Sequence, residues 1–272
     1  MPGFNNLFRN RNYRALIIFI IFYIGYGALL TVKQESIIYQ PGNQQIAFAD
    51  CLELPSAERS SIGSTRFYHG QLGYESLVVV YHGNAGRACD RAFLANYISG
   101  LGFDYLLVEY TGYAADGLLS SHETFRSDVE NAVDYVSTLP YDRVVVLGKS
   151  LGVSAAALHT SLLPPQGLIL ISAYPDFPSV ARHTYWFYPT SRLVRSPFPI
   201  SELLHDFDSP VLMIHAADDR LIPIKLGRQL AENLQNVSFV AITGRGHNDL
   251  FSAPETYEAL ADFLVDTPDR AE

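Results

Sequence analysis

The chain has little of several features that mark specialised classes of protein. Only two of its 272 residues are cysteine, charged residues make up 17%, and 19 Lys and Arg face 28 Asp and Glu. The net charge of −9 repels phosphate backbones and the basic residues form no stripe, so the sequence predicts no nucleic-acid partner. It also lacks a fixed-period repeat, a low-complexity tract and a Pro/Gly-rich linker, which excludes a repeat protein and favours one domain.

The two cysteines, Cys51 and Cys89, fit neither a metal site nor a CxxC redox motif. Two interpretations remain open at this point. The cysteines form a disulfide if the domain faces an oxidising compartment, or they are two buried thiols.

What the chain does have is a long uncharged apolar run near its start, from Ala15 to Val32. As a helix this run would be about 27 Å long, close to the hydrocarbon thickness of a bilayer. Arg9, Arg11 and Arg14 precede it, and positive charge beside a span favours the cytoplasmic side. We therefore predict a transmembrane signal anchor.

This prediction divides the chain into residues 1–14 as a cytoplasmic tail, 15–32 as the anchor, and 37–272 as one domain. That domain would lie on the opposite side of the membrane, in the periplasm, an organelle lumen or outside the cell. A cleaved signal peptide and a buried helix are the alternatives.

From residue 77 onward, β-rich apolar runs alternate with stretches of helical spacing. Unbroken apolar runs are typical of parallel strands that helices cover on both faces. The sequence predicts an α/β fold with a doubly wound, mostly parallel sheet, preceded by antiparallel edge strands within 37–75. The predicted strands are 77–81, 105–110, 144–147, 168–172, 211–215 and 237–242, and the predicted helices are 88–99, 121–137, 153–163, 225–233 and 254–265.

One stretch, 174–207, interrupts this alternation. It holds five prolines and the aromatic run from Tyr185 to Tyr188, which includes Trp186. Insertions over the carboxyl ends of strands are where ligands bind in α/β sheets. We predict a cap that lines the substrate pocket; the alternative is a long surface connection.

The candidate nucleophile is Ser150, in the run Gly148-Lys149-Ser150-Leu151-Gly152 between a predicted strand and a predicted helix. Glycines two positions before and after a serine suit a sharp strand-to-helix turn, because the backbones pass too closely for a Cβ atom. The same turn directs the Leu151 amide to the first turn of the helix, where free N–H groups favour a developing negative charge.

A serine needs a base and an acid that orients the base, and loops after the last two strands supply both. Asp218 and Asp219 follow the strand at 211–215, and His247 follows the strand at 237–242. All of them lie at carboxyl ends of strands, the same edge as Ser150. The order Ser, acid, His is that of α/β-hydrolases.

In these features residues 77–265 resemble the α/β-hydrolase superfamily, and within it the single-span, membrane-anchored serine hydrolases with an HGNAG loop. The matching segments are His82-Gly83-Asn84-Ala85-Gly86, Tyr110-Thr111-Gly112-Tyr113, His215 to Pro223, and Gly246-His247-Asn248. The resemblance implies that the Asn84 amide completes an oxyanion hole with Leu151. It also assigns the acid to Asp219, although Ala216 stands where the family has glycine and Asp218 is the adjacent alternative.

The sequence thus predicts a serine hydrolase of the carboxylesterase, lipase or thioesterase type, with Ser150, Asp219 and His247 as catalytic residues. Its partners would be a small-molecule or lipid acyl substrate and the membrane, and the mechanism requires no metal or organic cofactor. A serine peptidase on the same triad and a non-catalytic membrane-tethered binding module are the alternatives. The sequence does not indicate an oligomeric state.

Overall fold

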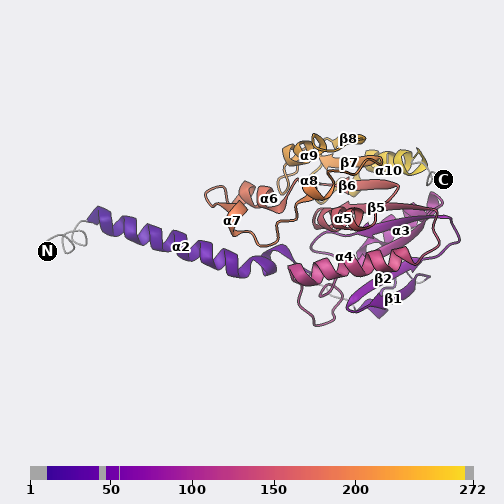
Figure 1. Ribbon diagram of the computed structural model, residues 1–272, viewed down its shortest axis with the longest axis horizontal. Coiled ribbons are helices and arrows are strands. Elements are labelled where there is room, and N and C mark those ends of the chain that lie inside the picture. The colour runs from indigo at the N-terminus through magenta and orange to yellow at the C-terminus, as the bar shows by residue number, and fades with distance from the viewer. Residues whose placement is uncertain (1–10, 43–46, 55, 267–272) are drawn as a thin grey trace.

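The structure is a computed structural model, and it describes residues 11–42, 47–54 and 56–266 (Figure 1). The first ten residues of the predicted cytoplasmic tail, Arg9 among them, lie outside the described residues. So do 43–46, 55 and 267–272 of the predicted domain.

The centre of the molecule is an eight-stranded sheet in the order β1-β2-β4-β3-β5-β6-β7-β8. The strands β3 to β8 run parallel, whereas β2 pairs antiparallel with both β1 and β4. The bounds are β1 Glu58–Ile62, β2 Thr65–Gly70, β3 Ser76–Tyr81, β4 Asp104–Glu109, β5 Arg143–Lys149, β6 Gly167–Ile171, β7 Val211–Ala216 and β8 Val237–Ile242. The predicted parallel sheet with antiparallel edge strands is confirmed.

Helices cover both faces of the sheet, which explains the unbroken apolar runs. Because side chains alternate along a strand, Leu77 and Val79 of β3 enter one core and Val78 and Val80 enter the other. The first core is closed by α4 (His122–Ser137), α5 (Leu151–Leu162) and α9 (Ile224–Ala231), and the second by α3 (Ala92–Gly100) and α10 (Pro254–Asp266).

The predicted helices all occur; α10 begins at Pro254 as predicted, and the other four have shifted starts. Helix α5 begins at Leu151 and not at 153, because the elbow residue Ser150 is itself the residue before the helix. Helix α3 begins at Ala92, after a short 3₁₀ turn at Cys89–Arg91, whereas the predicted helix began at 88. Both shifts fall where the chain turns at the carboxyl ends of strands.

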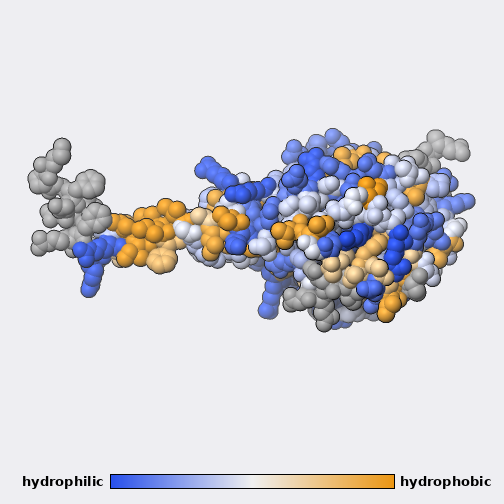
Figure 2. Space-filling view, turned by 90° about the horizontal axis from the view of Figure 1, so that it is seen from below, coloured by the Kyte–Doolittle hydropathy of each residue, from blue (hydrophilic) through white to orange (hydrophobic). Residues whose placement is uncertain are grey.

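The N-terminal helix α2 (Arg11–Ile38) projects from the domain (Figure 1). Its 28 residues make it longer than the predicted anchor at both ends. Only 6% of its most apolar window is buried, which argues against a helix within the core, and hydrophobic atoms surround its projecting part (Figure 2). Among the described helices, α2 alone is long and apolar enough to cross a membrane, and this fits a single transmembrane span.

Helix α2 continues past the predicted anchor because its last turns pack against the insertion at 174–207. Gly27, Gln34 and Ile38 are its buried residues. A Cβ atom on Gly27 would lie 2.8 Å from the Tyr188 ring, so only glycine permits this approach. The insertion forms α6 (Phe177–Thr184), α7 (Thr190–Leu193) and α8 (Ile200–Leu203), and we call it the cap.

A disulfide joins Cys51 to Cys89 and ties the segment before β1 to the turn before α3. Together with Glu53, these cysteines are the one group of potential metal ligands that the described residues bring together. A metal would need both sulfurs as free thiolates, and the disulfide occupies them. The structure therefore contains the disulfide and not two buried thiols.

Candidate active site

Ser150 occupies the sharp turn between β5 and α5. Its φ is 55° and its ψ −118°, a left-handed conformation that a residue other than glycine adopts only under strain. A Cβ atom on Gly148 would lie 2.3 Å from the carbonyl oxygen of Gly152, and one on Gly152 would lie 2.1 Å from that of Tyr81. The flanking glycines are thus required by close backbone contact, and the turn holds the serine at the carboxyl edge of the sheet.

His247 lies between Ser150 and Asp219. Its Nε2 is 3.0 Å from Ser150 Oγ, and its Nδ1 is 2.7 Å from Asp219 Oδ2. The imidazole and the carboxylate are buried, whereas the serine is half-buried. The structure therefore brings together the three residues that the sequence nominated, in the geometry of a nucleophile, a base and an orienting acid.

The backbone holds Asp219 in place. Its Oδ1 accepts hydrogen bonds from the amides of Leu221 and Ile222, at 2.9 and 2.7 Å. Burial alone would raise the pKa of Asp219, but the hydrogen bond from His247 and the backbone amides outweigh it, so the pKa lies below its usual value. Asp218 is exposed, so it is Asp219 that meets the imidazole.

The loop after β3 lies against the serine. A Cβ atom on Gly83 would lie 3.2 Å from Ser150 Cβ and 3.1 Å from the carbonyl oxygen of Lys149. The Ala85 amide donates to the Gln40 carbonyl at 2.9 Å. Within the described part of the chain, the amides of Asn84 and Leu151 have no such acceptor. One of these amides lies in the loop after β3 and the other at the first residue of α5.

The side chain of Asn84 fixes this loop to the end of α2. Its Nδ2 donates to the carbonyl of Ile38 at 2.5 Å, and its Oδ1 accepts from the Gln40 amide at 3.1 Å and from the Tyr113 hydroxyl at 2.6 Å. Sequence reasoning gave Asn84 a backbone role only. The segment 38–40 lies far away in sequence and carries no local motif, so nothing in the pattern indicated this contact.

His82 stabilises the loop after β3 through its ring and its backbone carbonyl. Its Nδ1 donates to the Gly83 carbonyl at 2.8 Å, and its Nε2 is 3.3 Å from Glu109 Oε1. The Tyr110 hydroxyl donates to the His82 carbonyl at 3.0 Å. The ring is buried among these partners, so it shapes the loop and does not face Ser150.

Two cations near the site were not singled out by the sequence. Arg91 lies against the loop: a Cβ atom on Gly86 would lie 2.6 Å from its guanidinium. Burial, and then the charge of Arg91, lower the pKa of Lys149 to about 8. Lys149 occupies the variable position of the elbow, where sequence offers no hint of its surroundings.

The cap reaches the elbow helix α5 through its first residue, Tyr174. The Tyr174 hydroxyl, just after β6, is 2.7 Å from Ser154 Oγ on α5. Phe177 at the start of α6 contacts both Tyr174 and Phe198 edge to face. Aromatic side chains thus connect the cap to the core beneath Ser150.

Comparison with known proteins finds hydrolases among the proteins that this chain resembles. The chain is 28% identical over 271 residues to an uncharacterized protein of Mycobacterium tuberculosis, covering 93% of this chain and 96% of that one. It is 27% identical to the lysophosphatidylserine lipase ABHD12 of Mus musculus over 73% of this chain, and it spans 58% of that protein's length. No family model matches the sequence.

Two solved structures with the same fold are esterases. The Pyrococcus furiosus esterase PF2001 superimposes with a TM-score of 0.64 at 15% identity, covering 85% of this chain and 97% of its own. Est1E from Butyrivibrio proteoclasticus superimposes with a TM-score of 0.63 at 17% identity, covering 78% of this chain and 98% of its own. With the sheet order and the strand-to-helix turn at Ser150, these likenesses show that the chain has the α/β-hydrolase fold, and the named lipase and esterases among them support a serine hydrolase of the esterase and lipase type.

Proposed function

We propose that this chain cleaves acyl esters or thioesters of lipid-like, membrane-proximal substrates, with Ser150, His247 and Asp219 as its catalytic residues. The observation that carries the proposal is the unbroken line of contacts from Ser150 Oγ through His247 to Asp219, at 3.0 and 2.7 Å. Such a line activates a serine that is otherwise a poor nucleophile.

In the first half of the reaction, Ser150 Oγ forms a bond to the acyl carbon while His247 Nε2 takes the hydroxyl proton. The tetrahedral intermediate then breaks its bond to the leaving oxygen or sulfur, which receives that proton from His247. In the second half, water attacks the acyl-enzyme by the same route and releases the acid. Asp219 holds the imidazole in the required tautomer and stabilises its charged form.

The amides of Asn84 and Leu151 would stabilise the negative oxygen of both intermediates. A preorganised donor of this kind contributes roughly 3 kcal/mol where one has been removed in other enzymes. The support here is the contact of Gly83 with Ser150 and the position of Leu151 as the first residue of α5.

The membrane part of the proposal rests on α2 and on the disulfide. We infer that residues 15–32 span the bilayer with the N-terminus in the cytoplasm, so that the hydrolase domain lies on the other side. A disulfide at Cys51 and Cys89 is consistent with this, because disulfides persist in oxidising compartments. The named activity of the ABHD12 relatives supports a lipid substrate.

The test is labelling of the full-length chain with a fluorophosphonate probe, combined with hydrolysis of p-nitrophenyl esters. We expect labelling and turnover in the wild type, and loss of both in Ser150→Ala. The control is Ser161→Ala, which removes an exposed serine of the same helix. A Ser150→Ala variant that keeps wild-type turnover would refute the proposal.

The same assays separate the alternatives. A binding module would show neither labelling nor turnover in the folded wild type. A peptidase would label at Ser150 but would cleave peptides far better than esters. Ester turnover that depends on both Ser150 and His247 supports the esterase over both.

A further inference from the structure

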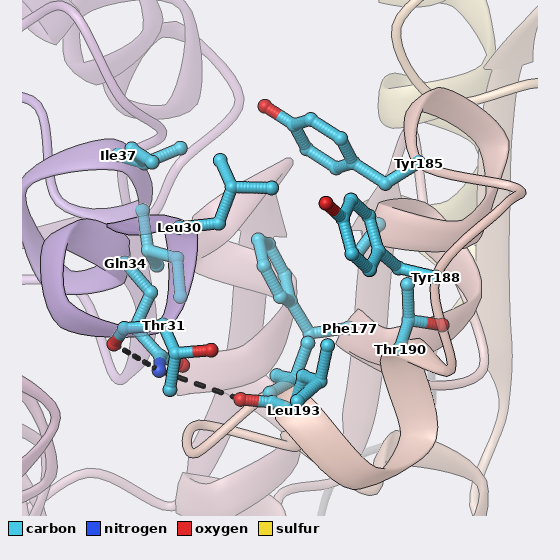
Figure 3. Close-up of a pocket in the computed structure, with 12 residues that line it drawn as sticks. Leu30, Thr31, Gln34, Ile37, Phe177, Tyr185, Tyr188, Thr190 and Leu193 are labelled. Atoms are coloured by element: carbon cyan, nitrogen blue, oxygen red, sulfur yellow. Dashed lines mark hydrogen bonds between the residues drawn. The ribbon is translucent and has the colours of Figure 1, made fainter. Parts of the chain in front are cut away.

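An apolar pocket lies between the anchor helix and the cap, on the side of the domain from which α2 projects (Figures 1 and 3). Its interior volume is about 80 Å³, and it opens to solvent. The helix α2 forms one wall and the cap the other, with Tyr185, Tyr188 and Phe177 extending from the cap toward α2. The pocket therefore exists only where the anchor and the hydrolase domain meet.

Three of the polar side chains along this pocket, those of Thr31, Gln34 and Thr190, are bonded to other groups of the protein. Thr31 Oγ1 donates to the Gly27 carbonyl at 2.9 Å, and Thr190 Oγ1 donates to the Pro178 carbonyl at 3.0 Å. The amide of Gln34 donates to the Thr31 carbonyl at 2.8 Å, and its oxygen accepts from the Arg195 amide. What remains for a ligand is hydrocarbon surface, which selects an apolar occupant without a polar head.

A line of residue contacts connects the wall of the pocket to the loop beside the candidate nucleophile. Ile38 lines the pocket, and its carbonyl accepts the hydrogen bond from the Asn84 side chain. Asn84 follows Gly83, which packs directly on Ser150. This line of contacts relates the pocket wall to the loop beside Ser150.

The cap also contacts α2 closer to the start of the helix, at Tyr23. The Tyr23 hydroxyl donates to the Phe187 carbonyl at 2.7 Å, and the Tyr188 hydroxyl donates to the Tyr23 carbonyl at 2.6 Å. Tyr23 lies within the apolar run of α2. These bonds therefore hold the aromatic run from Tyr185 to Tyr188, which we call the cap tip, against the part of the helix that would enter the bilayer. A lipid could reach the pocket without crossing water.

We propose that this pocket binds the acyl chain of the lipid substrate, so that the anchor helix forms one wall of the substrate site as well as tethering the enzyme. The inference rests on the proposed esterase function and adds the subsite that selects the acyl chain. Its occupant is a single unbranched hydrocarbon chain whose ester carbonyl lies at Ser150.

The test fills the pocket and measures selectivity for chain length in the full-length protein, reconstituted in nanodiscs. Ala181 lines the pocket from α6, and Ala181→Phe places a ring in it. Ser191→Phe is the matched control, since Ser191 is an exposed cap residue that does not line the pocket. A second pair is Leu30→Trp, inside the pocket, against Leu29→Trp, whose side chain is exposed.

Burying one methylene group increases binding about fourfold, so displacing two or three of them lowers binding about 15- to 60-fold. We expect Ala181→Phe and Leu30→Trp to lower kcat/KM for p-nitrophenyl palmitate at least tenfold relative to p-nitrophenyl acetate. The two control variants should keep the wild-type ratio. Retained acetate turnover reports an intact fold and catalytic site.

Two outcomes overturn the proposal while leaving the esterase function intact. An unchanged palmitate-to-acetate ratio in both pocket variants means that the pocket holds a resident bilayer lipid or nothing. If a control variant loses chain-length selectivity as strongly as the pocket variant with which it is paired, the loss does not come from filling the pocket. Failure of the esterase function would differ from both, because the wild type would then hydrolyse neither ester.

Discussion

The side-chain amide of Asn84 donates a hydrogen bond of 2.5 Å to the carbonyl of Ile38, the last residue of α2. The anchor helix therefore ends on the loop that faces the candidate nucleophile. Gln40, two residues further on, bonds the same loop twice, through its amide to Asn84 and through its carbonyl to Ala85. Helix α2 is thus a structural neighbour of the candidate site.

Truncating the Asn84 side chain should displace the backbone amide of Asn84 and leave the binding of substrate unchanged. In Asn84→Ala we expect kcat on a soluble ester to fall about ten- to a hundredfold, with KM changed less than threefold, because the oxyanion donors act in the transition state. Gln40→Ala is the control, since it keeps the backbone bonds of residue 40 and removes an exposed side chain. A rise in KM with unchanged kcat would contradict this role.

Exchanging each of the adjacent carboxylates for an amide should distinguish them. Asp219→Asn removes the acceptor that orients His247 and should lower kcat by three to four orders of magnitude, as an equivalent change does in other serine hydrolases. Asp218→Asn alters an exposed side chain and should stay within about twofold. Comparable losses in the two variants, measured by ester turnover, would reassign the acid.

The parallel sheet was predictable because strands buried on both faces give unbroken apolar runs, such as the one that became β3. The elbow and the loop residues Asp219 and His247 were predictable because each follows a strand whose carboxyl end lies at the same edge. These features depend on local sequence and on the connection rule for parallel strands. Their roles in catalysis remain predictions.

Other features arise between segments that are distant in sequence, and no local pattern encodes them. The bond from Asn84 to Ile38 joins residues 46 apart, and the one from Tyr188 to Tyr23 joins residues 165 apart. The helix α2 continues past the predicted span for the same reason: Lys33 and Glu35 end the uncharged run, but cap contacts prolong the helix to Ile38. Tertiary packing decided that boundary.

Lys149 should weaken the fold at neutral pH. Burial and the charge of Arg91 lower its pKa to about 8, against about 10.4 in an unfolded chain. Between these values the unfolded state binds more protons, so the free energy of unfolding rises with pH through this window, and the penalty is complete below pH 8. Lys149→Met removes the penalty and should stabilise the protein by about 1–3 kcal/mol at pH 7.

The measurement is thermal or denaturant unfolding of both proteins from pH 7 to 10.5. The advantage of the variant should shrink as the pH rises. Lys225→Met, which replaces an exposed lysine, is the control and should show a constant difference. A Lys149→Met advantage that does not vary with pH would show that packing, and not charge, is responsible.

Removing the disulfide should destabilise the domain through its unfolded state. Cys51 and Cys89 are 38 residues apart, and closing a loop of that length contributes about 4 kcal/mol in the chain-entropy model. We expect Cys51→Ser/Cys89→Ser to lower the free energy of unfolding by about 2–4 kcal/mol in urea melts. Reducing agent should destabilise the wild type and leave the double variant unchanged; sensitivity of the variant to reductant would refute the assignment.

Trp186 reports on where the cap tip lies relative to the bilayer. It is the one tryptophan of the chain and is 77% exposed, beside Phe187, whose carbonyl accepts the Tyr23 hydroxyl bond. Exposed indole rings favour the membrane interface, so we expect Trp186 to insert there when α2 spans the bilayer. In nanodiscs, brominated lipids should quench its emission, and the emission maximum should lie to the blue of that in denaturant.

The control moves the reporter to the opposite edge of the domain. Trp186→Phe/Tyr74→Trp places the only indole just before β3, at the amino ends of the parallel strands, where Tyr74 is 41% exposed. Brominated lipids should leave this emission unchanged. Equal quenching at the two positions, or none at Trp186, would mean that the cap tip does not touch the bilayer, and a lipid would then have to reach the pocket through water.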